Sequence, residues 1–156
     1  MAPRRCKIGY TERMERFWET VPLAEMTAEQ WEALCDGCGK CCLEKLEEEG
    51  SGRIHYTNVA CELLDRSTGR CQHYGARFHL MPSCLPLNPK TIQNPHWLPR
   101  TCAYRRLQEG KPLPAWHPLL SGDPNSVRRA GHSVADRVIA PRSAGLLIHH
   151  LIDWID

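Results

Sequence analysis

The chain has no long hydrophobic run that could cross a membrane. Its most apolar stretch, residues 145–155, is short and is interrupted by two histidines and an aspartate, whereas a spanning helix needs roughly 18 or more apolar residues. No apolar segment follows the basic residues Arg4 and Arg5, so the pattern of an export signal is missing as well. We therefore expect a soluble protein of the cytoplasm with no membrane partner.

The sequence also lacks a strong charge of one sign. The formal net charge is +2 at pH 7 for 156 residues, and no basic stripe of the kind that nucleic-acid binders carry can be traced. A nucleic-acid partner is therefore not expected. No phosphate-binding loop, zinc-protease helix or readable nucleophile–base pair occurs. The patterns thus identify no catalytic residue and no protein or small-molecule partner, and they leave the oligomeric state open.

Apolar residues are too few for a large core. Only 42% of the residues are hydrophobic, and the mean hydropathy is -0.47. The 12 prolines and 11 glycines are scattered along the chain, which cuts it into short elements. We expect a small α+β fold, with short helices and irregular loops around a cysteine-rich metal centre and little sheet. Its single domain should span residues 11–140, after a flexible N-terminus (1–10) and before a tail (141–156) that can pack on the domain.

Local patterns predict several short elements in the first half of the chain. Apolar spacing favours a helix over residues 12–20, and Thr27 with Gln30 forms a capping-box pattern that begins a second helix. Residues 41–49 have a pattern compatible with a helix, residues 50–52 (Gly-Ser-Gly) predict a turn, and residues 54–59 favour an extended strand. The turn at residues 67–69 separates Cys61 from Cys71, which fits a short hairpin with one cysteine on each arm.

In the second half, proline and glycine decide most of the predictions. Five prolines between residues 81 and 100 exclude long regular elements there. Residues 101–109 favour a helix that ends at Gly110. Asp123 followed by Pro124 predicts the start of another helix, with Gly131 at its end.

Cysteine is the one residue type that is unusually abundant and clustered. Nine cysteines occur, and all but Cys6 fall between residues 35 and 102. The segment 35–42 reads Cys-Asp-Gly-Cys-Gly-Lys-Cys-Cys, with two overlapping Cys-x-x-Cys units and glycines between them. Such spacing lets neighbouring sulfurs reach one ion, at about 2.3 Å for zinc. In a reducing compartment, clustered cysteines indicate metal or redox chemistry rather than disulfides.

The adjacent pair Cys41 and Cys42 raises the question of how many ions are bound. Adjacent side chains are expected to diverge, so the two sulfurs would face different ions or belong to one multinuclear cluster. The cysteines outside the segment 35–42 are candidate ligands because a metal bound by this segment needs further ligands to complete its coordination. The candidate ligands are Cys35, Cys38, Cys41, Cys42, Cys61, Cys71, Cys84 and Cys102.

Zinc and iron both remain open on this reasoning. The spacing of Cys35, Cys38 and Cys41 matches the first part of a ferredoxin-type iron–sulfur run, but the usual cysteine followed by proline is missing, because Leu43 follows Cys42. Histidine could replace a thiolate, and four histidines lie within the cysteine region: His55, His73, His79 and His96. His117 could instead hydrogen-bond a group next to a ligand.

The segment 35–42 resembles the CxxCxxCC proteins, the YkgJ-type family described as a zinc- or iron-chelating domain, and within it the YcgN-like branch. The resemblance covers about residues 15–140. Further stretches that carry it are Phe17-Trp18-Glu19, Tyr56-Thr57-Asn58-Val59-Ala60-Cys61, His96-Trp97-Leu98-Pro99, Thr101-Cys102-Ala103-Tyr104-Arg105 and Trp116-His117-Pro118-Leu119.

The resemblance implies that these cysteines, Cys6 excluded, are the metal ligands, and it implies no established reaction. Our first hypothesis is a binding protein that chelates zinc or iron. The alternative is an iron–sulfur or multinuclear-iron enzyme with a redox or modification activity; a domain of this type also occurs in proteins linked to flagellin lysine methylation. A closed zinc site is colourless, whereas a catalytic iron centre absorbs visible light.

Overall fold

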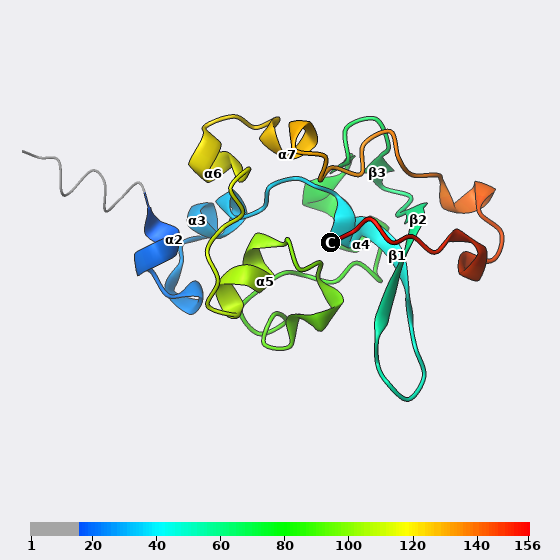
Figure 1. Ribbon diagram of the computed structural model, residues 1–156, viewed down its shortest axis with the longest axis horizontal. Coiled ribbons are helices and arrows are strands. Elements are labelled where there is room, and N and C mark those ends of the chain that lie inside the picture. Colours follow the sequence, from blue (N-terminus) through cyan, green and yellow to red (C-terminus); the bar gives the residue numbers. More distant parts are fainter. Residues whose placement is uncertain (1–15) are drawn as a thin grey trace, which may run out of the picture.

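A computed structural model describes residues 16–156 of the chain. Short helices gather at one end of the molecule, the β1–β2 hairpin projects from the other part, and the last residues return to the middle (Figure 1). The helices are α2 (Phe17–Thr20), α3 (Ala28–Ala33), α4 (Arg77–Leu80), α5 (Ala103–Gln108), α6 (Pro118–Ser121) and α7 (Ser126–Arg129). The strands are β1 (Leu43–Glu47), β2 (Ile54–Ala60), β3 (Leu64–Asp65) and β4 (Arg70–Cys71). The predicted α+β fold with little sheet is confirmed.

Single turns of 3-10 helix fill much of the remaining backbone. They are η1 (Leu23–Glu25), η2 (Lys40–Cys42), η3 (Tyr74–Ala76), η4 (Pro95–Trp97), η5 (Pro141–Ser143) and η6 (Leu147–His150). Between residues 81 and 100 the only helical turn is η4, as the proline density predicts.

Helix α3 begins with the predicted capping box. The Gln30 amide donates to the Thr27 side-chain oxygen at 3.1 Å, and the Thr27 amide donates to the Gln30 side chain at 3.0 Å. Two amides that a helix start leaves unpaired are thereby satisfied. The helix ends at Ala33, so the next residue, Leu34, carries the chain into the cysteine segment.

The prediction of a helix over residues 41–49 was wrong. After the turn η2, residues Leu43–Glu47 form β1, which pairs antiparallel with β2 across the predicted turn at residues 50–52. Leu43 is buried opposite Ala60. Contact with a partner strand decided the local structure here, because the short sequence pattern alone fits either element.

The predicted hairpin around residues 67–69 is present. Strands β3 and β4 pair with Leu64 opposite Cys71, and the Asp65 carboxylate accepts hydrogen bonds from the Ser67 and Thr68 amides within the turn. Cys71 therefore lies on one arm. Cys61 lies in the turn before the other arm, where its carbonyl accepts from the Leu64 amide at 3.0 Å.

Of the helices in the second half, α5 lies close to its predicted range, α7 begins later than predicted, and α6 was not predicted. Residues 103–108 form α5, close to the predicted range, and Gly110 follows with a left-handed φ of 72°. Helix α7 begins at Ser126, not at Pro124, because Asp123 is used in a turn in which its carboxylate accepts from the Asn125 amide. Helix α6 was not predicted. For the predicted helix over residues 12–20, the structure confirms only Phe17–Thr20, since residues before 16 lie outside the described part.

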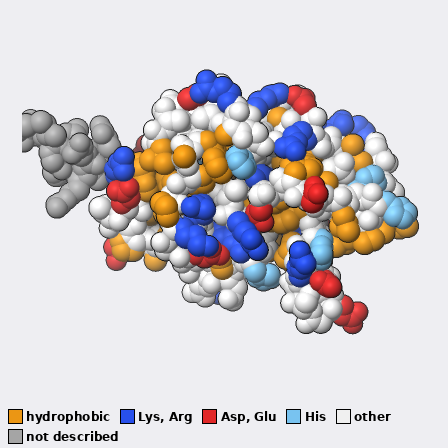
Figure 2. All heavy atoms as spheres, in the orientation of Figure 1, with side chains coloured by type: hydrophobic (Ala, Val, Ile, Leu, Met, Phe, Trp, Pro, Cys, Tyr) orange, Lys and Arg blue, Asp and Glu red, His pale blue; other side chains and the backbone are white. Residues whose placement is uncertain are grey.

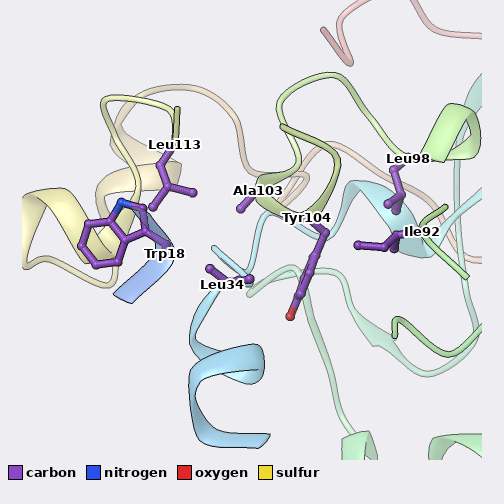
Figure 3. Close-up of a cluster of buried hydrophobic side chains, with 7 residues drawn as sticks. All are labelled: Trp18, Leu34, Ile92, Leu98, Ala103, Tyr104 and Leu113. Atoms are coloured by element: carbon purple, nitrogen blue, oxygen red, sulfur yellow. The ribbon is translucent and has the colours of Figure 1, made fainter. Parts of the chain in front are cut away.

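Two small cores hold these elements together. The first contains Trp18, Leu34, Ile92, Leu98, Ala103, Tyr104 and Leu113, brought from α2, α3, α5 and the connecting loops (Figure 3). The second contains Leu43, Tyr56, Ala60, Leu64, Val134, Val138 and Ile155. Cys41 packs against the first core and Cys42 against the second. The cysteine pair therefore lies where the two cores meet.

The C-terminal segment returns to the strands and the cysteine loop. Leu151 forms an isolated bridge with Thr57, and the Ile152 amide donates to the Tyr56 carbonyl at 3.0 Å. Ile155 is buried in the second core. On the face in Figure 2, acidic and basic side chains are interspersed. Within residues 16–156, no helix has the length and apolarity to span a membrane.

Candidate metal centre

The loop 35–42 depends on glycine at position 39. Gly39 has a φ of 77°, in the left-handed region that favours glycine. A Cβ atom at this position would lie 2.6 Å from both the Gly69 carbonyl oxygen and the Val134 Cγ2 atom. The loop can approach the β3–β4 turn this closely only because residue 39 has no side chain.

Hydrogen bonds fix the rest of this loop. The buried Asp36 carboxylate accepts from the Cys38 amide at 3.0 Å, and the Cys38 carbonyl accepts from the Val134 amide at 2.9 Å. Farther along, the Cys61 amide donates to the Cys42 carbonyl at 2.8 Å. The β1–β2 pairing thus brings a distant cysteine beside the last one of the loop.

The thiols of Cys41 and Cys42 interact with each other. A hydrogen bond from the Cys42 thiol to the Cys41 sulfur lowers the pKa of Cys41 to about 7 and raises that of Cys42. Their side chains nevertheless pack against different cores, Cys41 against the first and Cys42 against the second. The pair therefore fits both a cluster that shares sulfurs and two neighbouring ions.

Cys41 also influences four other cysteines. Desolvation by surrounding protein atoms raises the pKa of each thiol in this group, to about 12 for Cys35 and for Cys102, and the negative charge of Cys41 adds to the effect. Cys35 reaches the surface, although neighbouring atoms crowd it. The group is Cys35, Cys38, Cys84 and Cys102. The charge of Cys41 thus couples the titration of these four thiols.

The charges of the remaining candidates also act on other cysteines. The charge of Cys61 acts on Cys42 and on Cys84, and the charge of Cys71 also acts on Cys84. None of the described cysteines forms a disulfide. The candidates are therefore electrostatically coupled, while their role as metal ligands stays a prediction. Cys6 lies outside the described residues.

Electrostatic coupling between thiols does not by itself make a metal site. Among residues 16–156, no three side chains of His, Cys, Asp or Glu are arranged to hold a metal ion. The donor set suits zinc or iron in kind, because thiolate sulfur is a preferred ligand of both. Its sulfurs would have to move closer together to coordinate an ion, as happens in proteins where metal binding and folding are coupled.

His117 supports the cysteine loop from inside the fold. Its side chain has no exposed surface. Its Nε2 atom lies 2.8 Å from the Leu34 carbonyl oxygen, and its Nδ1 atom accepts from the Leu119 amide at 3.0 Å. Both ring nitrogens are occupied, so His117 holds the residue before Cys35 and is not itself a free ligand. A role of His117 beside a metal ligand stays a prediction, because it requires Cys35 to bind the metal.

Other histidines show no gathering around the thiols. His55 lies 3.5 Å from the Glu48 carboxylate, and His73, His79 and His96 are exposed. The structure brings none of them into an ion-binding group within the described residues.

Two lysines beside the cysteines, Lys40 buried and Lys45 partly buried, have no signal in the sequence. Lys45 donates to the Cys41 and Leu43 carbonyls, each at 2.8 Å. Lys40 is fully buried and donates to the Thr101 hydroxyl at 3.1 Å and to the Ile155 carbonyl. Nothing in the local sequence signals this, because a lysine beside cysteines is normally solvent-exposed.

The lysines place positive charge beside the thiols. Desolvation lowers the pKa of Lys45, and the charges of Cys41, Cys42 and Cys61 oppose that change. Desolvation likewise lowers the pKa of Lys40, against the charges of Cys38 and Asp36. A thiolate cluster carries a large negative charge, and the ammonium groups of these two lysines would offset part of it.

A comparison with protein families matches the cysteine-rich part of the chain. A family model described as "CxxCxxCC: Putative zinc- or iron-chelating domain" matches residues 34–103. This range contains all the candidate ligands. No solved structure matches the chain.

Full-length relatives extend the similarity beyond that range. A UPF0260 protein of Rhizorhabdus wittichii is 57% identical over 137 residues, which is 88% of this chain and 94% of the relative. A UPF0260 protein of Gluconobacter oxydans is 51% identical over 88% of this chain and 85% of its own length. One from Cellvibrio japonicus is 48% identical over 89% and 96%. The chain belongs to the UPF0260 family, and its residues 34–103 match the model of the CxxCxxCC domain.

Proposed function

We propose that the protein chelates zinc or iron through its clustered cysteines. The carrying observation is that the loop 35–42 holds four of them, and that the 2.8 Å hydrogen bond from the Cys61 amide to the Cys42 carbonyl brings a distant cysteine beside this loop. The electrostatic coupling of Cys84 and Cys102 to Cys41 is consistent with this arrangement. The matched domain description supports the same metals. The proposed ligands are Cys35, Cys38, Cys41, Cys42, Cys61, Cys71, Cys84 and Cys102.

The proposal includes a reducing location, namely the cytoplasm. Eight free thiols without a disulfide are typical of proteins kept reduced by glutathione and thioredoxin. It also keeps the YcgN-like branch as the finer family assignment, because the resemblance includes residues 17–19 and 116–119, outside the matched range 34–103.

A second candidate is an iron–sulfur or multinuclear-iron centre with a redox or modification activity. Two observations favour it. The contact between the Cys41 and Cys42 side chains suits a cluster that shares sulfurs, and Cys61 lines a surface cleft through which a small molecule could approach. Iron with acid-labile sulfide in the purified protein would select this candidate, and zinc without a visible band would exclude it.

Substitution of single cysteines tests the ligand set. We expect Cys35→Ser and Cys42→Ser to reduce the metal content of protein purified without oxygen, and Cys6→Ser, the matched control, to leave it unchanged. Complete loss in both ligand variants indicates one cluster, whereas partial loss in each indicates separate sites. Full metal content in both variants would contradict the proposed ligand set.

A further inference from the structure

A surface cleft of about 560 Å³ lies beside the cysteine group. Its walls come from the segment 61–67 with the β3–β4 hairpin and from the segment 136–142. Leu64, Val138 and Ala140 are buried beneath it. The volume falls within the range of roughly 300–1,000 Å³ typical of small-molecule sites.

Hydrogen bonds hold the two walls in place. The Asp136 amide donates to the Arg66 carbonyl at 2.8 Å, and the Arg128 guanidinium bridges the Ser67 carbonyl and the Asp136 carboxylate. At the other end, Ile139 is bonded to β2 through its amide and its carbonyl. Asp136 has a φ of 62°, a conformation that only a well-determined surrounding maintains in a residue other than glycine. The cleft is therefore preformed.

Some charged side chains of the cleft have a partner within the protein and others do not. Asp65 is used by the hairpin turn, and Asp136 is paired with Arg128. Arg66 and Arg142 are exposed residues that line the cleft, and the guanidinium group of neither makes a hydrogen bond or ion pair with another described residue. Glu62 is the only lining carboxylate without such a partner in the described part.

We propose that this cleft binds a small molecule with a carboxylate or phosphate group, held by Arg66 and Arg142. A guanidinium donates two parallel hydrogen bonds to either oxyanion, so the two chemistries are recognised alike. The apolar lining contacts the rest of the ligand, and Cys61, a candidate metal ligand, also lines the cleft. The site does not depend on the proposed metal, since none of its anion-binding residues is a candidate ligand.

The test is a calorimetric titration of the protein, as purified without oxygen, with citrate and separately with inorganic phosphate. We expect binding of at least one probe, weakened tenfold or more by Arg66→Gln and by Arg142→Gln. Arg53→Gln, an exposed arginine outside the cleft, should bind as the unaltered protein does. Citrate binding alone identifies an organic carboxylate, and phosphate binding identifies a phosphate-bearing ligand.

A second measurement locates the bound probe. Saturating probe should slow the modification of Arg66 and Arg142 by phenylglyoxal, followed by mass spectrometry, and should leave the rate at Arg53 unchanged. Absence of binding by both probes, or equal binding by the arginine variants and the unaltered protein, would overturn the proposal. A Cys35→Ser protein that has lost metal but still binds the probe separates this site from the metal centre.

Discussion

At the scale of single residues, His117 links the second half of the chain to the cysteine loop. We predict that His117→Leu lowers the free energy of unfolding by about 1–3 kcal/mol, because the Leu34 carbonyl and the Leu119 amide lose their buried partner. Thermal or urea denaturation measures the change. His149→Leu, at an exposed position, is the control and should change stability little. Equal effects of the two substitutions would contradict the role assigned to His117.

Gly39 offers a second test at the same scale. Gly39→Ala and Gly110→Ala both place a side chain on a left-handed backbone, with φ values of 77° and 72°. Only at position 39 would the new Cβ meet other atoms closer than 3 Å, whereas nothing lies within 4 Å at Gly110. We predict that Gly39→Ala is the more destabilising by about 1–3 kcal/mol, measured by urea denaturation. Similar losses in both variants would show that the close approach to Gly69 is not required.

The residues that sequence reasoning missed share one property. Lys40 contacts Thr101 and Ile155, which are 61 and 115 positions away along the chain. No local window contains such contacts, so a buried lysine next to cysteines looks like an ordinary surface residue. The cysteine candidates, by contrast, were found because four of them fall within residues 35–42.

At the scale of elements, the sequence was most informative where a side chain specifies its own backbone. The Thr27 capping box and the glycines at turns act on nearby amides or φ angles, so α3, the β1–β2 turn and the β3–β4 hairpin were predicted. Strand β1 was mistaken for a helix because its pairing with β2 decides its conformation. Helix α6 was missed because its cap is His117, which is not among the residues that usually cap helices.

The end of α5 provides a test that depends on pH. Hydrogen bonds from Lys111 and then Arg105 lower the pKa of Glu109 from 4.5 to about 2. A carboxyl group whose pKa is lower in the folded state stabilises the fold fully above its unfolded pKa, and this stabilisation is lost as the pH falls toward the folded value. We therefore expect the Tm difference between the unaltered protein and Glu109→Gln to be constant above about pH 6 and to shrink from about pH 5 to 3.

Glu49→Gln is the matched control for this measurement. Glu49 is exposed and has no hydrogen bond or ion pair with another described residue, so its substitution should leave Tm nearly unchanged across the same range. A Tm difference for Glu109→Gln that grows on acidification would contradict the lowered pKa.

At the scale of the whole molecule, the cysteine group lies between two small cores. Cys41 belongs to the edge of one core and Cys42 to the edge of the other. Neither core is large, so ligands drawn from both would join them when an ion binds. The cleft beside Cys61 and the return of the C-terminal segment also exist only at this scale, because each combines segments that are far apart in sequence. Sequence patterns could therefore predict the donor set but not its surroundings.

Metal content is the most direct test of the central claim. Elemental analysis and an absorption spectrum of the protein purified without oxygen should show zinc or iron bound to the chain, at about two ions for two sites with four thiolates each. Removal of that metal with a chelator should lower Tm, because metal binding and folding are coupled. Reduced protein that holds neither metal, and whose Tm does not change when zinc or iron is added, would contradict the claim that these cysteines form a metal centre.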